Sequence, residues 1–460
     1  MHPSSLIRRP AALAWTLAAA FAAAYSCVAV NRHRRGLTQS YDLGIFEQAV
    51  RAYAHGSAPI VPLKGPGYHL LGDHFHPLLM LLAPAYRAFP TPVTLLVAQA
   101  VLLALAVVPL TRWAHRSAGP GAALVVGCGV GASWGIVSAA ADDFHEIAFA
   151  VPLLAFAATA LGQRRPLAAA LWSLPLLLVK EDLGLTVAAF GGLIAWQARR
   201  DGRGPGPGLA LAAAGVAGTL LTVLVLLPAF NPQGGFDYWH QLDAGGPDRP
   251  LWQPALQLGW PPVKWLLLSL LTATAGFLGL RSPLALLCLP TLGWRLLADN
   301  PHYWGVGYHY SAVLMPLLFA ALTDALGRAA PHRARRALAV SALVAAVTLP
   351  LYPLHEVVMP EGWRTPPRLV ATRSMLEWIP DGAEVAASNR LAAQLTHRTT
   401  VSLVCRDDAP PPEWVAVDLT DPSVKSPCAI TDTARMLVRY EQQGYRRLVD
   451  RDGLVLLQRP

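Results

Sequence analysis

Charged residues are scarce in this sequence, and their scarcity is uneven along the chain. Only 14% of the 460 residues are Asp, Glu, Lys or Arg, and 54% are apolar, whereas soluble domains carry about 25% charge. Long apolar stretches fill residues 11–354, and a normal density of charge returns after them. The composition therefore excludes a fully soluble protein and indicates a membrane protein with many spans.

Cysteine is also rare, and no motif points to a common cofactor. The chain has five cysteines and neither a zinc-ribbon spacing nor a Gly-rich phosphate loop. Cys27, Cys128 and Cys288 fall inside apolar runs and are expected to be packing residues. Cys405 and Cys428 lie in the polar C-terminal part, where they are candidates for a disulfide if that part faces an oxidising compartment.

Basic residues outnumber acidic ones, and the net charge is +9. They form short clusters between apolar runs, not a basic stripe interleaved with aromatic residues. This pattern excludes a nucleic-acid partner and is typical of the positive residues that flank membrane spans. The lipid bilayer is therefore the first expected partner.

Eleven apolar runs have lengths suited to helices that cross a bilayer or pack inside a helix bundle. They are 11–30, 92–111, 121–140, 147–162, 166–179, 184–198, 208–230, 263–280, 283–298, 310–327 and 336–354. We predict a mainly α, polytopic helical membrane protein. A further apolar segment, 76–89, would invert every later loop if it were a span. We therefore expect a surface helix there, inside a first external loop at 31–91.

This assignment places almost all clustered basic residues on the cytoplasmic side, as the positive-inside rule requires. Those residues are Arg8, Arg9, Arg112, Arg116, Arg164, Arg165, Arg199, Arg200, Arg203, Arg281, Arg328, Arg333, Arg335 and Arg336. Arg32, Arg34 and Arg35 are the exception and fall outside. The pattern predicts a cytoplasmic N-terminus and an extracytoplasmic C-terminal segment.

The same topology gathers acidic and histidine residues on the outer face, where charges beside spans mark functional sites. These candidates are Asp42, Glu47, Asp73, His74, His76, Asp142, Asp143, His145, Glu146, Lys180, Glu181, Asp182, His302, His309 and Tyr310. We predict that they share one site. In the loop at 231–262, we instead expect Trp239, Trp252 and Trp260, with His240 among them, to form an interfacial aromatic belt.

Two kinds of chemistry fit the acidic and histidine residues. A carboxylate near the membrane surface can act as a general base toward an acceptor hydroxyl. Alternatively, carboxylates and imidazoles can bind a divalent metal ion. The pairs Asp73 with His76 and Asp142 with His145 are spaced to share one helical face, so these four are the candidate metal ligands.

The order of these features resembles the GT-C glycosyltransferases, the class that contains protein mannosyltransferases and aminoarabinose transferases. Members have one span, a large external loop with an early acidic residue, and a surface helix with a His/Lys-Pro-Pro-Leu-like start. Here Tyr41-Asp42 resembles the acidic start, and His76-Pro77-Leu78-Leu79 resembles the start of the helix. The resemblance implies a GT-C fold, often with a C-terminal external domain.

Three segments are more closely similar to a family of bacterial predicted membrane proteins defined by domain of unknown function 2079. They are Asp42–Gln48, Gly72–Pro77 and Lys180–Asp182. The likeness covers most of the chain. It implies a location in the bacterial plasma membrane and a fold of the GT-C group.

The GT-C resemblance also implies a reaction and roles for several residues. The donor would be a polyprenyl-phosphate sugar, and the acceptor an envelope glycan, lipid or protein. Asp42 matches the acidic residue that positions or deprotonates the acceptor, and Asp142 or Asp143 matches the acidic position of the second loop. Many members have Asp-Glu where this chain has Asp42-Leu43, so Glu47 and Asp73 stay alternative bases.

The donor phosphate would need positive partners. Lys180, Arg295 and Lys264 are the candidates near outer ends of spans. Lys180 also has two acidic neighbours, Glu181 and Asp182, with which it could pair, and long basic side chains near span ends often reach toward the interface instead.

From residue 359 the sequence changes to alternating short helices and strands. We expect helices at 373–378, 389–395 and 431–443 and strands at 384–388, 400–404, 414–419, 445–449 and 453–457. This predicts a multi-spanning domain at 1–358 and a small extracytoplasmic α/β domain at 359–460.

Three functions are compatible with this reading. A membrane glycosyltransferase that uses a polyprenyl-phosphate sugar at the outer face is favoured, because the acidic residues cluster at span ends on one side. A transporter or lipid flippase would place polar residues near the bilayer midplane. A non-catalytic scaffold of an envelope pathway is the third alternative.

Overall fold

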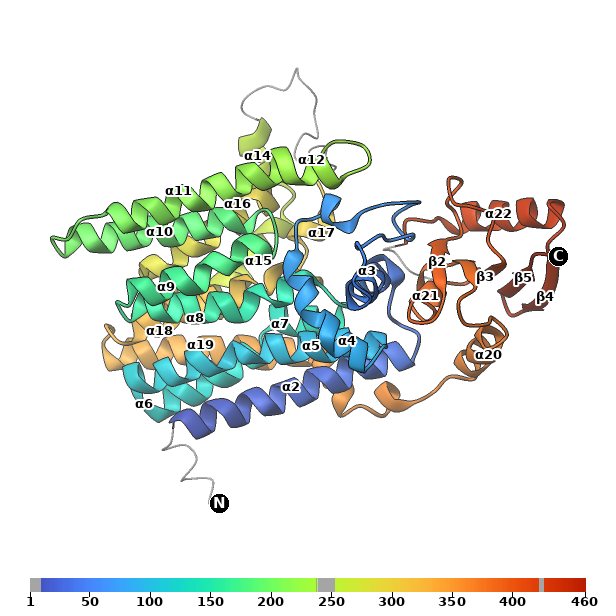
Figure 1. The fold of residues 1–460 in the computed structure, drawn as a ribbon. Coiled ribbons are helices and arrows are strands. Elements are labelled where there is room, and N and C mark those ends of the chain that lie inside the picture. Colours follow the sequence, from blue (N-terminus) through green and yellow to red (C-terminus); the bar gives the residue numbers. More distant parts are fainter. Residues whose placement is uncertain (1–9, 237, 239–252, 422–425) are drawn as a thin grey trace.

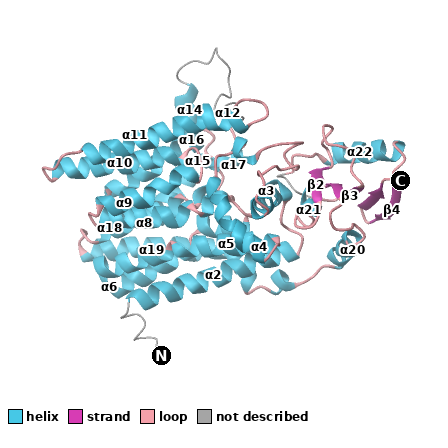
Figure 2. Cartoon of the chain, in the orientation of Figure 1, coloured by secondary structure: helices cyan, strands magenta, loops and turns pink. Residues whose placement is uncertain are grey.

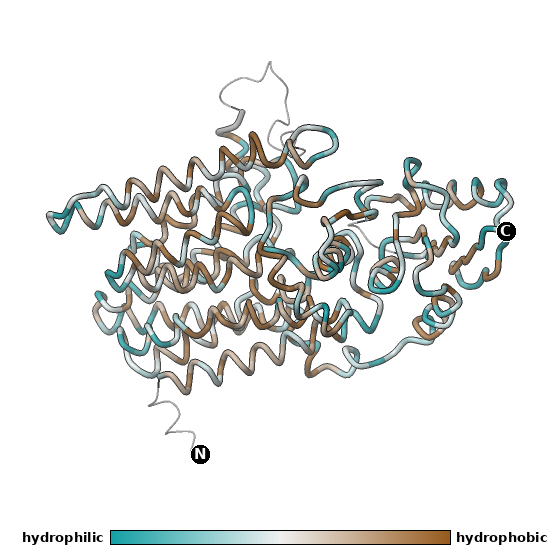
Figure 3. Tube along the Cα trace, viewed as in Figure 1, coloured by the Kyte–Doolittle hydropathy of each residue, from teal (hydrophilic) through white to brown (hydrophobic). Residues whose placement is uncertain are grey.

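The structure is a computed structural model that describes residues 10–236, 238, 253–421 and 426–460. Trp239, His240 and Trp252 lie outside the described residues, as do Arg8 and Arg9. Figure 1 shows a bundle of long helices with a small sheet and its own helices at one end. The hydropathy colouring of Figure 3 places the apolar residues along the bundle and the polar ones at its ends and around the sheet.

The first three apolar runs form the base of the bundle. Helix α2 (Pro10–Arg34) packs against α5 (Pro92–Leu105) and α6 (Val107–Gly131), and α7 (Trp134–Ala141) follows. Within α6 the chain reverses at Gly119, whose φ of 85° suits glycine. A Cβ on Gly127 would lie 2.5 Å from the Thr111 hydroxyl, so the two sides of this hairpin are in close contact. The runs predicted at 92–111 and 121–140 are therefore separate antiparallel segments.

The remaining runs are also helical. Their main helices are α8 (Ala150–Gly162), α9 (Pro166–Ser173), α10 (Leu183–Arg200), α11 (Gly206–Leu221), α12 (Leu227–Phe230), α14 (Gln253–Gly259), α15 (Val263–Thr274), α16 (Leu289–Leu297), α17 (Pro301–Trp304), α18 (Leu314–Leu326) and α19 (Pro331–Thr348). Five helical tracts of the described chain are long and apolar enough to cross a membrane, and several shorter apolar helices accompany them. Helix α18 is the most enclosed of the five, since most of its tract is buried.

Segment 76–89 folds as a short helix outside the long bundle helices. A 3-10 turn at Pro77–Leu82 leads into α4 (Ala83–Ala88). Leu79 and Tyr86 are buried against the protein, whereas Leu81 and Phe89 are about two-thirds exposed. One apolar face therefore packs on the protein and another is left uncovered, as expected of a helix at a membrane surface.

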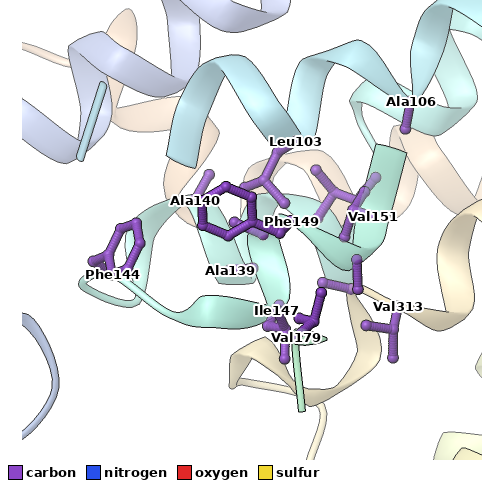
Figure 4. Packing of buried hydrophobic residues seen from close by; sticks show 14 of the residues in the cluster. Leu103, Ala106, Ala139, Ala140, Phe144, Ile147, Phe149, Val151, Val179 and Val313 are labelled. Atoms are coloured by element: carbon purple, nitrogen blue, oxygen red, sulfur yellow. The ribbon is translucent and has the colours of Figure 1, made fainter. Parts of the chain in front are cut away.

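The connection between α7 and α8 packs on an apolar core formed by side chains of several helices. Figure 4 shows Phe144 and Ile147 from this connection among apolar residues of neighbouring segments. Phe144 is fully buried, as are Val151 and Val179. The backbone that carries the acidic residues of the second loop is thus anchored by packing on both sides.

The basic loops meet at one end of the bundle. Arg164, Arg200, Arg281 and Arg328 come from four connections and line one pocket of about 800 Å³. In Figure 1 the connection between α10 and α11 lies at the opposite end from the sheet. These loops therefore share a side, as the predicted topology requires. The assignment of that side to the cytoplasm stays a prediction.

The C-terminal part is a five-stranded mixed sheet with helices, as Figure 2 shows. Its elements are α20 (Pro367–Leu376), β1 (Glu384–Ala387), α21 (Asn389–Ala392), β2 (Thr400–Leu403), β3 (Trp414–Asp418), α22 (Ile430–Gln442), β4 (Arg446–Arg451) and β5 (Leu454–Gln458). The strand order is β2-β1-β3-β5-β4, with β1 parallel to β2 and β3 and the other pairs antiparallel. Compared with the expected helices, α20 begins at Pro367 and α21 ends at Ala392. A disulfide joins Cys405 to Cys428.

The loop at 31–91, which is predicted to be external, packs directly on this C-terminal part. From helix α3 (Ile45–Ala54), Gln48 donates to the Val401 carbonyl oxygen at 2.9 Å, and Arg51 donates to the Thr399 carbonyl oxygen at 2.9 Å. One continuous apolar cluster includes Val50 from the loop and Leu391 from the C-terminal part. The division at residue 358 stays a prediction, because these contacts join the two proposed domains.

Glycine allows α10 and α11 to pack backbone against backbone. A Cβ on Gly191 would lie 2.6 Å from the Gly208 carbonyl oxygen, and one on Gly184 would lie 2.6 Å from the Gly215 carbonyl oxygen. In each helix the two glycines of these contacts are seven residues apart, so they meet in matched pairs. Small residues at such positions let helices in membranes approach closely.

Replacing Gly191 by Val should destabilise the protein. The added side chain meets backbone that cannot move aside, and overpacking costs about 1–3 kcal/mol. The thermal unfolding midpoint of the purified protein should fall. Gly192→Val is the matched control, because a Cβ there meets nothing within 4 Å. Equal midpoints for the two variants would contradict the proposed close packing.

Candidate functional site

Loops from distant parts of the sequence meet at the end of the bundle that faces α3. Asp42 lies in the helical turn Ser40–Gly44 just before α3, Asp142 and Asp143 follow α7, and His145 precedes α8. His309 begins the tract that continues as α18. The packed helix ends fix these backbone positions, so the side chains converge without long flexible loops.

Five of these side chains form what we call the acidic–histidine cluster: Asp42, Asp142, Asp143, His145 and His309. The His145 Nε2 atom lies 3.3 Å from an Asp42 carboxylate oxygen, and His309 Nδ1 lies 3.0 Å from Asp142 Oδ2. The two imidazole rings stack with centroids 3.5 Å apart. The Asp42 side chain is 23% exposed and that of Asp142 is 12% exposed, so Asp42 is the more accessible carboxylate of these two pairs.

A buried glutamine that the sequence prediction missed supports this cluster. Gln99 on α5 donates to the carbonyl oxygen of Asp143 at 2.6 Å and accepts from the backbone N–H of His145 at 2.8 Å. The Asp143 carboxylate accepts from the Gln39 N–H at 3.1 Å, and Asp143 has a φ of 56°, in the left-handed region. An amide side chain inside an otherwise apolar span was the available signal for Gln99.

Next to the cluster lies a second group, the lysine network, formed by Glu146, Lys180, Glu181, Asp182 and His74. Lys180 Nζ lies 2.9 Å from a Glu146 carboxylate oxygen, so Lys180 pairs across the fold. His74 Nδ1 lies 2.7 Å from Glu181 Oε1. Because Glu146 directly follows His145 in the sequence, the two groups are neighbours.

The aromatic and loop residues around this network complete its hydrogen bonds. The Trp294 indole N–H donates to Asp182 at 3.0 Å. Asp73 pairs with Lys64 at 3.0 Å and accepts from the Tyr238 hydroxyl at 2.9 Å, and the Tyr238 ring stacks on His74. Lys64, Tyr238 and Trp294 were not predicted as site residues, since none belongs to an acidic or histidine motif.

Burial and pairing set the ionisation of the loop residues. Burial alone would raise the pKa of Asp73, but Lys64 and His74 lower it overall. Burial likewise opposes charge on both Glu181 and His74, yet their mutual attraction lowers the pKa of Glu181 and raises that of His74. Burial raises the pKa of Asp182 to about 6, despite the opposing effect of Lys180. The network thus combines charged pairs with the Asp182 carboxyl, whose pKa is raised to about 6.

His76 is placed differently from the other loop histidines. It is almost fully buried, and its ring meets Phe46 edge-on at 5.6 Å between centroids. Burial lowers its pKa to about 4, with Glu146 acting in the opposite direction. A neutral, buried imidazole packed on Phe46 is better suited to holding the surface helix in place than to contacting a substrate.

Arg295 on α16 is fully buried and held by neutral acceptors. It donates to the Tyr303 carbonyl oxygen at 2.5 Å, the Tyr310 carbonyl oxygen at 3.3 Å and the Ser311 hydroxyl at 3.2 Å. Within the described residues it pairs with no carboxylate, and its Nη2 atom has no hydrogen-bond partner. A buried guanidinium with a spare donor is a suitable partner for an anion.

Glu47 lies apart from the acidic–histidine cluster, although it is fully buried. Its carboxylate accepts from the Tyr86 hydroxyl of α4 at 2.9 Å and from the Thr396 hydroxyl of the C-terminal part. Burial raises its pKa to about 7, even though Thr396 and Tyr86 stabilise the charged form. Glu47 therefore joins the surface helix, α3 and the C-terminal part.

Asn389 of the C-terminal part holds the backbone that leads into Asp42. Its side-chain oxygen accepts from the Ser40 hydroxyl at 2.8 Å and the Tyr41 N–H at 3.0 Å, and its amide donates to Gln39 at 3.1 Å. Asn389 is almost fully buried. No sequence motif marks this role, because the two segments are about 350 positions apart.

Two other predicted residues lie outside both groups. Asn300 caps α17 by accepting from the His302 backbone N–H at 3.0 Å, and the same side-chain oxygen is 2.9 Å from the His302 ring. Lys264 donates to the Leu296 carbonyl oxygen at 2.7 Å and lies over the Trp304 ring. Tyr310, in contrast, stacks obliquely against His309 at 4.1 Å between centroids and so borders the acidic–histidine cluster.

The donor sets of this cluster suit a divalent metal ion. Ligand atoms of Asp142, His145 and His309 lie within 4.8 Å of one another, and so do those of Asp42, Asp142 and Asp143. The first set, with two imidazoles, suits a transition metal, and the all-carboxylate set suits a harder ion. Asp73 and His76, the other predicted ligands, belong to neither set.

The arrangement of the helices is a GT-C fold. It is similar to the crystal structure of ArnT from Cupriavidus metallidurans bound to undecaprenyl phosphate, with a TM-score of 0.56 and 12% identity over 95% of this chain and 96% of that chain. The chain belongs to the family of predicted membrane proteins DUF2079, whose model matches residues 32–456. No curated protein matches the sequence.

The buried carboxyl of Glu47 should make stability depend on pH. Its pKa is about 7 when folded and about 4.3 when unfolded, so the folded state gives up this favourable protonation as pH rises through 7. Between about pH 5.5 and pH 8, the fall in thermal midpoint should be smaller in Glu47→Gln than in the wild type.

The matched control is Glu361→Gln, which removes an exposed carboxylate. It should retain the wild-type dependence of the midpoint on pH. If Glu47→Gln and the wild type lose the same number of degrees, the buried Glu47 carboxyl does not titrate in this range.

Proposed function

We propose that this protein is a membrane glycosyltransferase that moves a sugar from a polyprenyl-phosphate donor to an envelope acceptor at the outer face of the membrane. The observation that carries the proposal is the convergence of Asp42, Asp142 and Asp143 with two imidazoles at helix ends of a GT-C fold. ArnT binds undecaprenyl phosphate, which supports a polyprenyl phosphate as the group that leaves the donor here.

Asp42 is the proposed general base. It is more exposed than Asp142, and its carboxylate lies 3.3 Å from His145 Nε2. The Asp42 carboxylate takes the proton of the acceptor hydroxyl while the acceptor oxygen bonds to the anomeric carbon. The bond between that carbon and the phosphate oxygen breaks, and the polyprenyl phosphate leaves with the electron pair. The sugar configuration is inverted.

Arg295 is the proposed partner of the departing phosphate. Lys180 already pairs with Glu146, whereas Arg295 has an unused donor atom and no carboxylate partner in the described part of the chain. A charge-assisted contact from a guanidinium stabilises the negative charge that develops on the leaving group. A divalent ion on Asp142, His145 and His309, if bound, would add positive charge near the same centre.

The proposed orientation in the membrane is supported by the same arrangement. The acidic–histidine cluster lies toward the sheet, and the basic loops line the pocket at the other end of the bundle. The positive-inside rule then places the arginine end in the cytoplasm and the cluster and residues 359–460 outside. The donor lipid reaches the site along the outer leaflet.

Turnover should depend on Asp42 and Asp142. In lipid nanodiscs, a panel of polyprenyl-phosphate sugars is tested with and without a divalent metal ion. Asp42→Asn should lower kcat about 100-fold or more, because a general base contributes about that factor. Asp142→Asn should lower activity and remove any dependence on metal. Asp73→Asn should have a smaller effect, because Asp73 pairs with Lys64 and Tyr238.

Asp381→Asn is the matched control, since that side chain is 82% exposed and belongs to neither group. It should retain wild-type turnover. Wild-type activity in Asp42→Asn would transfer the role of base to another carboxylate. If folded protein neither binds nor turns over any donor of the panel, the scaffold or transporter interpretation replaces this one.

Asn389 should act as a positioning residue for Asp42. Asn389→Ala frees the backbone of residues 39–41, so kcat should fall about tenfold, the effect of about 1.4 kcal/mol, while the KM for the donor stays unchanged. Arg51→Gln is the control, because it loosens the same interface without touching residues 39–41. Equal loss of kcat in both variants would indicate that only attachment of the C-terminal part matters.

A further inference from the structure

A second charged pocket lies between the end of α2 and the C-terminal part. It has a volume of about 320 Å³ and is lined by five guanidinium groups against two carboxylates. The guanidinium groups belong to Arg35, Arg368, Arg373, Arg390 and Arg398. A pocket with such an excess of positive charge is suited to an anionic ligand.

Three of the five arginines are engaged by the protein itself. Arg368 lies 2.6 Å from Asp418, and Arg390 lies 3.2 Å from Asp421. Arg398 donates to the Leu376 carbonyl oxygen at 2.7 Å. These contacts fix the walls of the pocket.

The other two arginines retain binding capacity. Arg35 is 3.9 Å from Glu356, a carboxylate that already pairs with Arg32 at 2.6 Å. The Arg35 Nε atom is buried and, within the described residues, has no hydrogen-bond partner. Arg373 donates to the Arg34 carbonyl oxygen and, within the same residues, forms no ion pair. Among the described residues, Arg35 therefore has only a long ion pair, and Arg373 has only a backbone acceptor, so both can offer positive charge to the pocket.

The pocket lies where lipid headgroups would be. Arg35 directly follows α2, whose length and composition suit a membrane span. Beside it, Asn31 donates to the Gly362 carbonyl oxygen at 3.0 Å, which brings the exposed Trp363 to the end of that helix. Val370 on α20 is also more than half exposed. Exposed tryptophan and apolar residues beside arginines are typical of the membrane–water interface.

We propose that this pocket binds the phosphate headgroup of an anionic membrane lipid. Its volume suits a headgroup, and a lipid in the leaflet around α2 can present its phosphate to Arg35 and Arg373 without leaving the bilayer. The acyl chains would remain outside, next to Trp363 and Val370. The site is separate from the acidic–histidine cluster and does not depend on the proposed glycosyl transfer.

The test measures binding of short-chain phosphatidylglycerol to the full-length protein in a neutral detergent. The double variant Arg35→Gln/Arg373→Gln should bind at least about tenfold more weakly, since both positive charges that attract the anionic headgroup are removed. Phosphatidylcholine and inorganic phosphate, tested separately, should bind more weakly than phosphatidylglycerol to the wild type.

The matched control is Arg435→Gln/Arg451→Gln, which removes two exposed arginines of the C-terminal part outside the pocket. It should bind like the wild type, and so should Arg35→Lys/Arg373→Lys, which retains both charges and shows that the sites tolerate substitution. Unchanged binding in the Gln pair, or equal weakening in the control, overturns the proposal. Inorganic phosphate that binds as tightly as phosphatidylglycerol overturns the lipid as its source.

Discussion

The ion pair between Lys180 and Glu146 is the contact on which the site depends. It joins the segment just before α10 to the turn before α8. Glu146 is buried and the Lys180 side chain is only 16% exposed, so the carboxylate depends on the cation for its charge. Two more carboxylates follow Lys180 directly. His74 from the first loop contacts Glu181, and Trp294 on α16 donates to Asp182. A cation in this position lets several acidic groups lie together at the helix ends, and the acidic–histidine cluster lies one residue away.

The first external loop has a similar joining role on a larger scale. Its helix α3 contacts the C-terminal part through Gln48 and Arg51, while Glu47 also reaches the surface helix through Tyr86. The segment with Asp42 is held by Asn389 from one side and by packing against the bundle from the other. The candidate base is therefore fixed by parts of the chain that belong to different predicted domains.

Much of the fold could be predicted, because hydrophobicity dictates it locally. The apolar runs are helical in the structure. Segment 76–89 is a short helix outside the long bundle helices, and counting the basic loops had predicted that it is not a span. The strands after residue 384 were visible as short apolar runs between turns. The fold class was also predictable, since the acidic start at Asp42 and the helix start at His76 occur in the order of the GT-C class.

The partners of individual side chains could not be predicted, because they depend on how helix ends meet in space. Lys180 pairs with Glu146 although two acids adjoin it in sequence, and Asp73 pairs with Lys64 although His76 has the spacing of a ligand. Gln99 and Asn389 act through single amide groups that no motif marks.

The hydrogen bonds from Asn389 to residues 39–41 have a consequence for biosynthesis. A ribosome completes the chain from the N-terminus, and Asp42 enters the translocation machinery when most of its partners do not yet exist. His309 arrives after the greater part of the bundle, and Asn389 and Thr396 arrive later still, near the end of translation. The contacts that hold the Asp42 segment are consequently completed last, so a prematurely terminated chain would lack the Asn389 hydrogen bonds to Ser40 and Tyr41.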